Sequence, residues 1–150
     1  IGGVAHTHSD YATTWAQAGR AIPCLGTTHA DYFDGPVPVT AALSDEAIAG
    51  AYEAETGEAL CAALAGLDPE GYPGALVRHH GPFCWGGDAA QAAHHAVILE
   101  AIAKMAYQTL ALAGEAGMPR ALRERHFSRK HGATACYGQT GKAKPQRGRG

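Results

Sequence analysis

The sequence predicts a single domain of mixed α/β class, and three observations support this prediction. The length of 150 residues fits one domain with its own hydrophobic core. Residues 1–8 and 74–79 are short apolar runs with β-branched side chains, which is typical of strands. Residues 88–113 form a longer apolar segment whose later polar positions recur every four residues, which predicts a helix.

The first part of the chain is predicted to contain short elements and an irregular stretch. Ser9 is a favourable N-cap, so we expect a helix from Asp10 to about Gly19. Residues 22–44 contain several prolines and glycines, which predicts a short strand at 24–28 followed by a loop. The histidine and the acidic residues of this stretch are therefore expected on a loop.

A helix with an internal break is predicted in the middle of the chain. Ser44, followed by two acidic residues, is a favourable N-cap for a helix that runs to about Thr56. Gly57 is expected to break this helix before a second helical piece through Leu64. The strand at 74–79 then follows and is ended by a Gly-Pro pair.

Two further helices are predicted near the end of the chain. In the helix at 88–113, one stripe contains the polar residues after position 96, so we expect neighbours to cover most of its circumference. The stripe consists of Glu100, Lys104 and Gln108. The last helix is expected from Pro119 to Lys130 or His131, directly before Gly132.

The composition excludes several classes of protein. Charged residues make up 17% of the chain and hydrophobic residues 46%, which is unlike a disordered protein. No uninterrupted apolar run reaches the roughly 18 to 20 residues that cross a bilayer, and the first residues lack the features of a secretory signal. The four cysteines form no C-x-x-C pair, so we expect reduced core thiols in a cytoplasmic protein.

The charge is distributed unevenly along the chain. Residues 1–116 carry 13 acidic and 3 basic residues, whereas residues 117–150 carry 1 acidic and 9 basic residues. The basic end is suited to face an anion, but few aromatic residues accompany it and the remaining chain would repel phosphates. We therefore expect no nucleic-acid partner. The domain is expected to span residues 1–139, with a flexible basic tail at 140–150.

The nine histidines contain the strongest chemical signal. His6 and His8 are two residues apart in a predicted strand, so their side chains leave the same face. Such a pair can bind one metal ion, although it also arises by chance in a histidine-rich chain. His79 and His80 end another apolar strand and can supply a third imidazole. Three neutral imidazoles with an open coordination position describe a catalytic site, for which zinc is the default metal.

Four runs spread over about residues 2–139 carry further motifs. They are GGVAHTHSDYATTWAQAGRAIPCLGTTHADYF, YEAETG, HHGPFCWGGDAAQAAHHAVILEAIAKMA and HFSRKHGATACYGQ. On these motifs, and on the order of the His-Thr-His, Thr-His-Ala-Asp-Tyr-Phe and Tyr-Gly-Gln runs, the chain resembles the 4-epimerases of the class II aldolase and epimerase family.

The resemblance implies a fold and a reaction. The fold is a three-layer α/β/α arrangement with a central, mostly antiparallel sheet, here missing its N-terminal strands. The reaction is the zinc-dependent interconversion of L-ribulose 5-phosphate and D-xylulose 5-phosphate in arabinose catabolism, in which a retro-aldol step breaks the C3–C4 bond and an aldol step forms it again. The resemblance also implies one zinc ion per subunit and a homotetramer with active sites at its subunit interfaces.

The resemblance further implies roles for individual residues. The zinc ligands of the family correspond to His6, His8 and His80. The groups that move the proton of the C4 hydroxyl correspond to Asp31 and to Tyr137, the latter contributed by the adjacent subunit. Without the resemblance, Asp31 would be interpreted as a solvated loop acid and Tyr137 as an aromatic residue at the rim.

Three more residues match family positions that bind substrate. His126 and Arg129 correspond to residues that reach the neighbour's active site, and Arg129 suits an anionic substrate. Glu53 matches a position in the Tyr-Glu-x-x-Thr-Gly run. The other interpretations are a basic solvated helix face for the first two and an exposed helix acid for Glu53. The family usually has a histidine where this chain has Arg78.

Two other functions remain open. One is a class II sugar-phosphate aldolase of the fuculose or rhamnulose phosphate type, which shares the metal histidines. The other is an inactive metal-binding fragment. Family members carry an upstream segment whose loops bind the substrate phosphate, and the motifs of that segment are not found here. We therefore interpret the sequence as N-terminally incomplete and expect this chain alone to bind metal without turnover.

Overall fold

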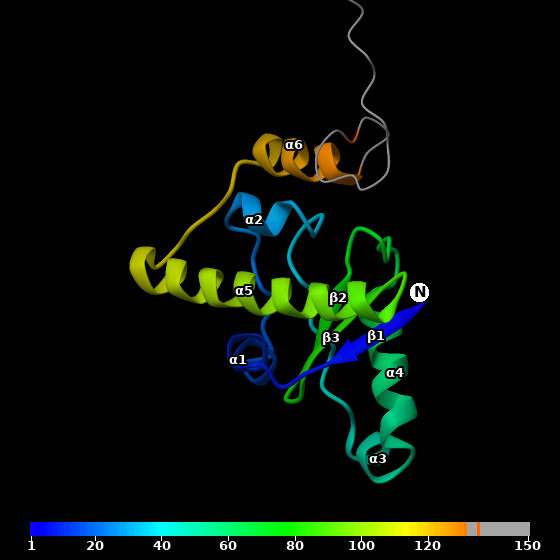
Figure 1. Cartoon of the computed structure of the whole chain (residues 1–150). Coiled ribbons are helices and arrows are strands. Elements are labelled where there is room, and N and C mark those ends of the chain that lie inside the picture. The colour runs from blue at the N-terminus through cyan, green and yellow to red at the C-terminus, as the bar shows by residue number, and fades with distance from the viewer. Residues whose placement is uncertain (132–134, 136–150) are drawn as a thin grey trace, which may run out of the picture.

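The computed structural model describes residues 1–131 and 135, in which helices surround a small sheet (Figure 1). The strands of this sheet are β1 (Gly3–His6), β2 (Gly74–Val77) and β3 (Gly81–Gly86). Their order is β1-β3-β2, and both neighbouring pairs are antiparallel. The mixed helix and antiparallel sheet confirm the predicted fold class. Tyr137 and the expected tail at 140–150 lie outside the described residues.

The two faces of the sheet have different neighbours. Helices α1 (Asp10–Gln17) and α5 (Ala89–Ala113) pack on one face, where the Cys84 sulfur and the Leu99 side chain meet over Gly74. His6 and Phe83 are partners in the β1–β3 pairing, and the alternation of side chains along a strand directs them to the opposite face. Helix α4 (Tyr52–Ala63) contacts β2. The sheet is therefore a central layer between helices.

The core lies between the sheet, α1 and α5. Its large side chains include Trp15, Ile22, Phe33, Leu76, Leu99 and Ile102. Two further contacts join α1 to α5. The Trp15 indole N–H donates to the Ala103 carbonyl at 3.0 Å, and the Glu100 carboxylate accepts hydrogen bonds from the backbone N–H groups of Tyr11 and Ala12 at 2.9 and 2.8 Å.

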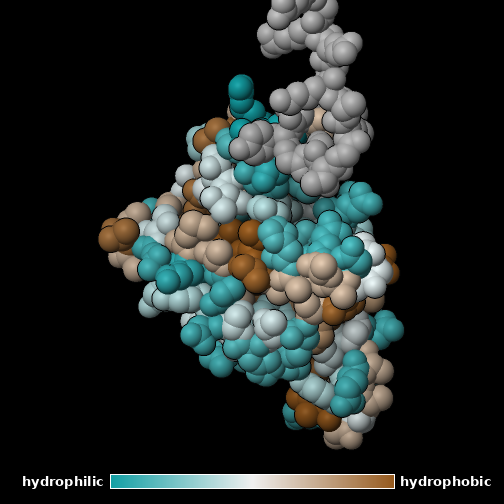
Figure 2. All heavy atoms as spheres, in the orientation of Figure 1, coloured by the Kyte–Doolittle hydropathy of each residue, from teal (hydrophilic) through white to brown (hydrophobic). Residues whose placement is uncertain are grey.

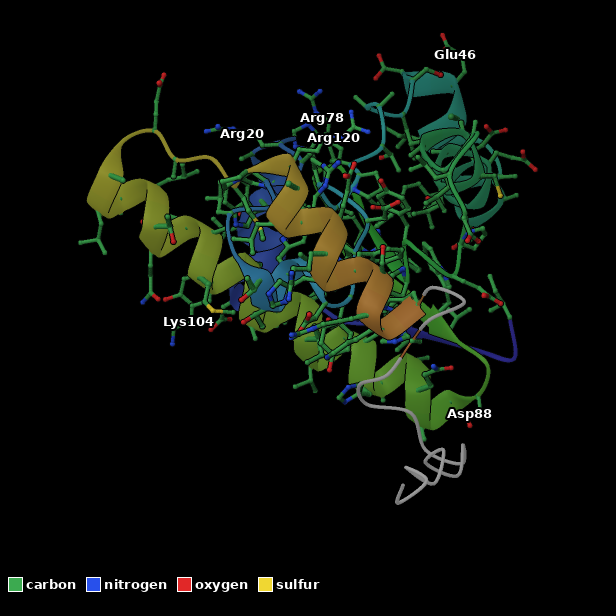
Figure 3. The ribbon with its side chains drawn as sticks, turned by 90° about the horizontal axis from the view of Figure 1, so that it is seen from above. Arg20, Glu46, Arg78, Asp88, Lys104 and Arg120 are labelled. Carbon is green, nitrogen blue, oxygen red and sulfur yellow. The ribbon has the colours of Figure 1, made fainter. Side chains whose placement is uncertain are left out.

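Glu100 therefore caps the N-terminus of α1, where backbone N–H groups lack partners within the helix and favour negative charge. Ser9, the expected cap, makes no side-chain capping hydrogen bond. Lys104 on the same polar stripe is exposed at the edge of the molecule in Figure 3, and its Nζ lies 5.5 Å from the centroid of the Tyr11 ring.

Helix α5 is covered less completely than the sequence suggested. Val97 is 68% exposed and Leu112 90% exposed, and hydrophobic residues lie at the surface over α5 (Figure 2). The reason is that, among the described helices and strands, α5 packs mainly against α1 and one face of the sheet, which leaves part of its circumference at the surface. By length and composition α5 could cross a membrane, a criterion that core helices of soluble proteins also meet. Its buried side chains pack against the sheet, as in a core helix.

The expected strand at 24–28 is wrong. The structure has a short helix, α2 (Thr27–Ala30), and a single bridge pairs Ile22 with Val37. Pro23 has no backbone N–H to continue a strand ladder, and Gly26 is the N-cap of α2. As a result, Asp31 lies at the end of a helix and not in an irregular loop.

The predicted helix break is also misplaced. Helix α3 (Asp45–Ala49) ends with Gly50 as its C-cap, whereas Gly57 lies inside α4. The sequence missed β3 because its Gly-Pro start was interpreted as the end of a strand. The last helix, α6 (Arg120–His131), matches its prediction. Among the described cysteines, Cys84 is buried and Cys24 half-buried, but Cys61 is exposed and is therefore not a core thiol.

Candidate metal centre

Three imidazoles converge at one end of the sheet. One nitrogen from each of His6, His8 and His80 lies within 4.8 Å of the other two. The ring centroids are 4.6 to 5.0 Å apart, and each pair of rings meets edge to face. Within the described part of the chain, no other group of three His, Cys, Asp or Glu residues is gathered in this way. The convergence expected for these side chains is present, and metal ligation by them stays a prediction.

The antiparallel pairing of β1, β2 and β3 creates this convergence. His6 ends β1, and His80 lies in the tight turn between β2 and β3, where the His80 N–H donates to the Val77 carbonyl at 3.0 Å. His79 adopts a left-handed conformation in this turn, with φ of 63°, and lies outside the group. A Cβ on Gly81 would lie 2.8 Å from the Thr7 carbonyl oxygen, so glycine lets the turn approach the end of β1.

Hydrogen bonds orient the first two rings. The His6 Nδ1 donates to the Pro82 carbonyl at 3.0 Å, because a carbonyl oxygen can only accept. In neutral His6 the lone pair is therefore on Nε2, which lies 3.1 Å from Nε2 of His8. The His6 ring also stacks on Phe83, with centroids 4.1 Å apart. The lone pair of His6 is thus held toward the centre of the cluster.

His80 is the most buried of the three side chains. Its Nδ1 lies 3.4 Å from the Tyr52 hydroxyl at the start of α4. Burial, followed by the neighbouring His6 and His8, lowers the pKa of His80. The neutral form that can donate a lone pair to a metal is therefore favoured. Three imidazoles on exposed to half-buried positions, each offering one nitrogen, fit a catalytic divalent metal site.

A second cluster surrounds Asp31, where α2 meets α6. The Asp31 carboxylate lies 2.9 Å from His126 Nδ1, 3.5 Å from Arg129 Nη2 and 3.4 Å from Lys130 Nζ. The side chain of Asp31 is only 16% exposed. The basic end of the chain thus faces an anion, and the anion that the structure places there is an aspartate of the same chain. Seen from above, α6 lies across the molecule nearest the viewer (Figure 3).

The structure therefore sorts the predicted site residues into two groups. His126 and Arg129 join Asp31 within one chain, so their expected reach into a neighbouring subunit stays a prediction. Glu53 is exposed on α4, and no contact between it and the three imidazoles is described. Arg78 is exposed, and its Nε lies 3.3 Å from the His79 ring. Tyr137 lies outside the described residues.

Comparison with known proteins identifies the family. The family model of the class II aldolase and adducin N-terminal domain matches residues 1–107. The chain belongs to this family. It is 51% identical over 140 residues to proteins named L-ribulose-5-phosphate 4-epimerase UlaF from Salmonella paratyphi A and from Salmonella typhi. These matches cover 93% of this chain and 61% of each relative, so the chain spans less than two thirds of their length.

A solved structure of an L-fuculose 1-phosphate aldolase has the same fold. The TM-score is 0.63 at 19% sequence identity, and the match covers 84% of this chain and 54% of that chain. At this identity the likeness concerns the fold alone. It agrees with the class II aldolase architecture that the motifs implied.

Sequence reasoning missed two residues that organise the family fold here. The sequence predicts Glu100 only as part of a polar helix stripe, and the packing of α5 on α1 reveals that it caps α1. The sequence alone does not predict the contact of Tyr52 with His80. The available signal is an aromatic residue with a hydroxyl directly before Glu53 in the Tyr-Glu-x-x-Thr-Gly run.

Proposed function

We propose that the full-length protein is a metal-dependent L-ribulose-5-phosphate 4-epimerase that interconverts L-ribulose 5-phosphate and D-xylulose 5-phosphate. The observation that carries this proposal is the convergence of His6, His8 and His80 in a chain that shares 51% identity with relatives of that name. The proposal includes a homotetramer with active sites at subunit interfaces, as the motifs imply. Because the chain spans 61% of those relatives, the activity is proposed for the whole protein.

The three imidazoles would hold the metal, and zinc suits their chemistry. Imidazole nitrogen is a borderline ligand that zinc binds well, and three protein ligands leave a position for substrate. His6 is already in the tautomer that such binding requires. When bound, a divalent metal supplies positive charge that stabilises negative charge on the carbonyl oxygen of a ketose.

Asp31 is the proposed proton-transfer group. Breaking the C3–C4 bond requires removal of the C4 hydroxyl proton, and forming it again on the other face requires a proton donor. A carboxylate serves the first task, and the motifs assign the second to Tyr137 of the adjacent subunit. His126 donates a hydrogen bond to Asp31 and holds it in position, while Arg129 brings positive charge that attracts a sugar phosphate.

The test is a coupled assay of the full-length protein on L-ribulose 5-phosphate, with D-xylulose 5-phosphate as the product. We expect conversion that chelator abolishes and added zinc restores. His80→Asn should lose both bound metal and activity. The matched control is His79→Asn, because His79 is the adjacent histidine outside the cluster and asparagine tolerates its left-handed conformation.

The other outcomes discriminate between the remaining functions. Cleavage of L-fuculose 1-phosphate without conversion of L-ribulose 5-phosphate would identify an aldolase. Bound metal with turnover of neither substrate would identify a metal-binding module. Full epimerase activity in the His80→Asn variant would show that the three imidazoles are not the site.

A further inference from the structure

In His6 and His80, one ring nitrogen has a hydrogen-bonding partner outside the three imidazoles, and the two partners differ in kind. In His6 this nitrogen donates to a backbone carbonyl, that of Pro82, at 3.0 Å. In His80 the corresponding nitrogen, Nδ1, faces a side chain, the Tyr52 hydroxyl, at 3.4 Å. Metal-binding histidines nearly always donate a hydrogen bond from the ring nitrogen that does not bind the metal. Tyr52 occupies the place of such a partner.

The tautomer of His80 decides whether it can bind a metal. A neutral imidazole carries one hydrogen, so Nε2 has a free lone pair only when the hydrogen is on Nδ1. In that form Nδ1 donates, and the Tyr52 oxygen accepts. If the hydrogen moves to Nε2, the nitrogen that Tyr52 does not contact loses its free lone pair. The Tyr52 oxygen can therefore accept from Nδ1 in the metal-binding form, and because a hydroxyl also donates, the contact orients the ring in either tautomer.

Tyr52 is fixed in this position by its helix. It is the first residue of α4, and α4 packs on β2, the strand that leads into the His80 turn. The hydroxyl of Thr56, a buried side chain, donates to the Tyr52 carbonyl at 2.8 Å and anchors the first turn of α4. The Tyr52 and His80 rings are tilted by 37°, with centroids 6.3 Å apart. The hydroxyl thus approaches His80 from a rigid support.

We propose that Tyr52 is a positioning residue that holds the His80 ring in the orientation required of a metal ligand, by accepting a hydrogen bond from Nδ1 when Nε2 binds the metal. The inference rests on the proposed metal centre and adds to it a residue outside the three imidazoles. The His6 contact uses a main-chain oxygen, so among the described contacts of the three rings Tyr52 supplies the outer partner that a side-chain substitution can remove.

The test compares Tyr52→Phe with the wild-type full-length protein, using zinc and cobalt as probes. Removing the hydroxyl should weaken zinc binding by about 10- to 100-fold in competition with a chromophoric chelator. The visible absorption of the cobalt form should change because the third imidazole is less well oriented.

The control is Tyr107→Phe, which removes a hydroxyl from an exposed tyrosine on α5. It should leave zinc affinity and the cobalt spectrum unchanged. Unchanged zinc affinity and an unchanged cobalt spectrum in Tyr52→Phe would overturn the inference while leaving the metal centre intact. A wild-type protein that binds no divalent metal would overturn the proposed function and this inference with it.

Discussion

The histidine cluster and the Asp31 cluster differ in their residue types and in the elements that carry them. The first is a group of three rings at the end of a sheet, oriented by a backbone carbonyl, a tyrosine hydroxyl and the face of Phe83. The second is a carboxylate between two helices, surrounded by one imidazole and two cationic side chains. The histidine cluster offers imidazole nitrogens to a ligand, whereas in the Asp31 cluster basic side chains compensate the charge of the carboxylate. The proposed function therefore assigns metal binding and proton transfer to separable parts of the chain.

The largest expected effect tests this separation directly. In the full-length protein, Asp31→Asn should lower kcat by about 10²- to 10⁴-fold because a general acid or base is lost, while the zinc content stays at the wild-type level. His8→Gln should instead lose zinc and activity together. Metal analysis and the coupled assay on the same samples measure both effects.

Asp34→Asn is the matched control for this pair. Asp34 lies three residues after Asp31 and is exposed, so its substitution should change neither zinc content nor kcat appreciably. Loss of zinc in Asp31→Asn would break the comparison, because it would show that the two clusters form one metal site.

The second prediction concerns the stability of the segment that carries Asp31. His29 is 4% exposed, and its Nε2 donates to the Gly35 carbonyl at 2.8 Å. Burial lowers the pKa of His29 from 6.5 to about 4, although the hydrogen bond to Gly35 opposes this effect. The folded state therefore resists protonation more than the unfolded chain does. Its stability is fully present above pH 6.5 and falls as the pH decreases toward 4.

The difference between these pKa values corresponds to about 3 kcal/mol of unfolding free energy lost across that range. Urea unfolding of the full-length protein between pH 7.5 and 4 measures this loss. His29→Gln keeps an N–H donor but does not titrate, so its stability should depend less on pH in the same window. His94→Gln, which alters an exposed histidine, should keep the wild-type dependence. If the unfolding free energy of His29→Gln depended on pH as that of the wild type does, His29 would be excluded as the source of the pH dependence.

The sequence predicted the long helix, the last helix and the first strand well, because their patterns are local. The Ala89–Ala113 helix has a strong N-cap in Asp88, whose side chain accepts from the Gln91 N–H. The three histidines could be grouped because strand geometry places His6 and His8 on one face and the motif supplied His80. Their convergence depends on sheet pairing between residues that are about 80 positions apart, which no local pattern contains.

The failures have physical causes of the same kind. Strand β3 was missed because Pro82 lacks a backbone N–H, yet its carbonyl accepts from Thr7 and from the His6 ring. The role of Glu100 depends on the packing of α5 against α1, and the environment of Asp31 depends on α6 lying over α2. Each of these contacts joins residues distant in sequence, so composition and periodicity carry little information about them.

The smallest expected effect concerns α4, the helix that presents Tyr52 to the histidine cluster. Gly57 is an exposed residue inside this helix, and a Cβ added there would meet no atom within 4 Å. Glycine in a helix interior destabilises it by about 0.5 to 1 kcal/mol relative to alanine. Gly57→Ala should therefore raise the unfolding free energy of the full-length protein by this amount, as measured by urea denaturation.

Gly50→Ala is the matched control, because the sequence predicts the helix break at Gly57 whereas the structure has it at Gly50. Gly50 has φ of −94° and ψ of −128°, and an added Cβ would lie 3.0 Å from the Glu46 carbonyl oxygen, so alanine should not stabilise the protein there. Zinc affinity should stay unchanged in Gly57→Ala, since Tyr52 acts on His80 through its hydroxyl and not through the stability of α4. A zinc affinity that rises with helix stability would instead assign the effect to the helix as a whole.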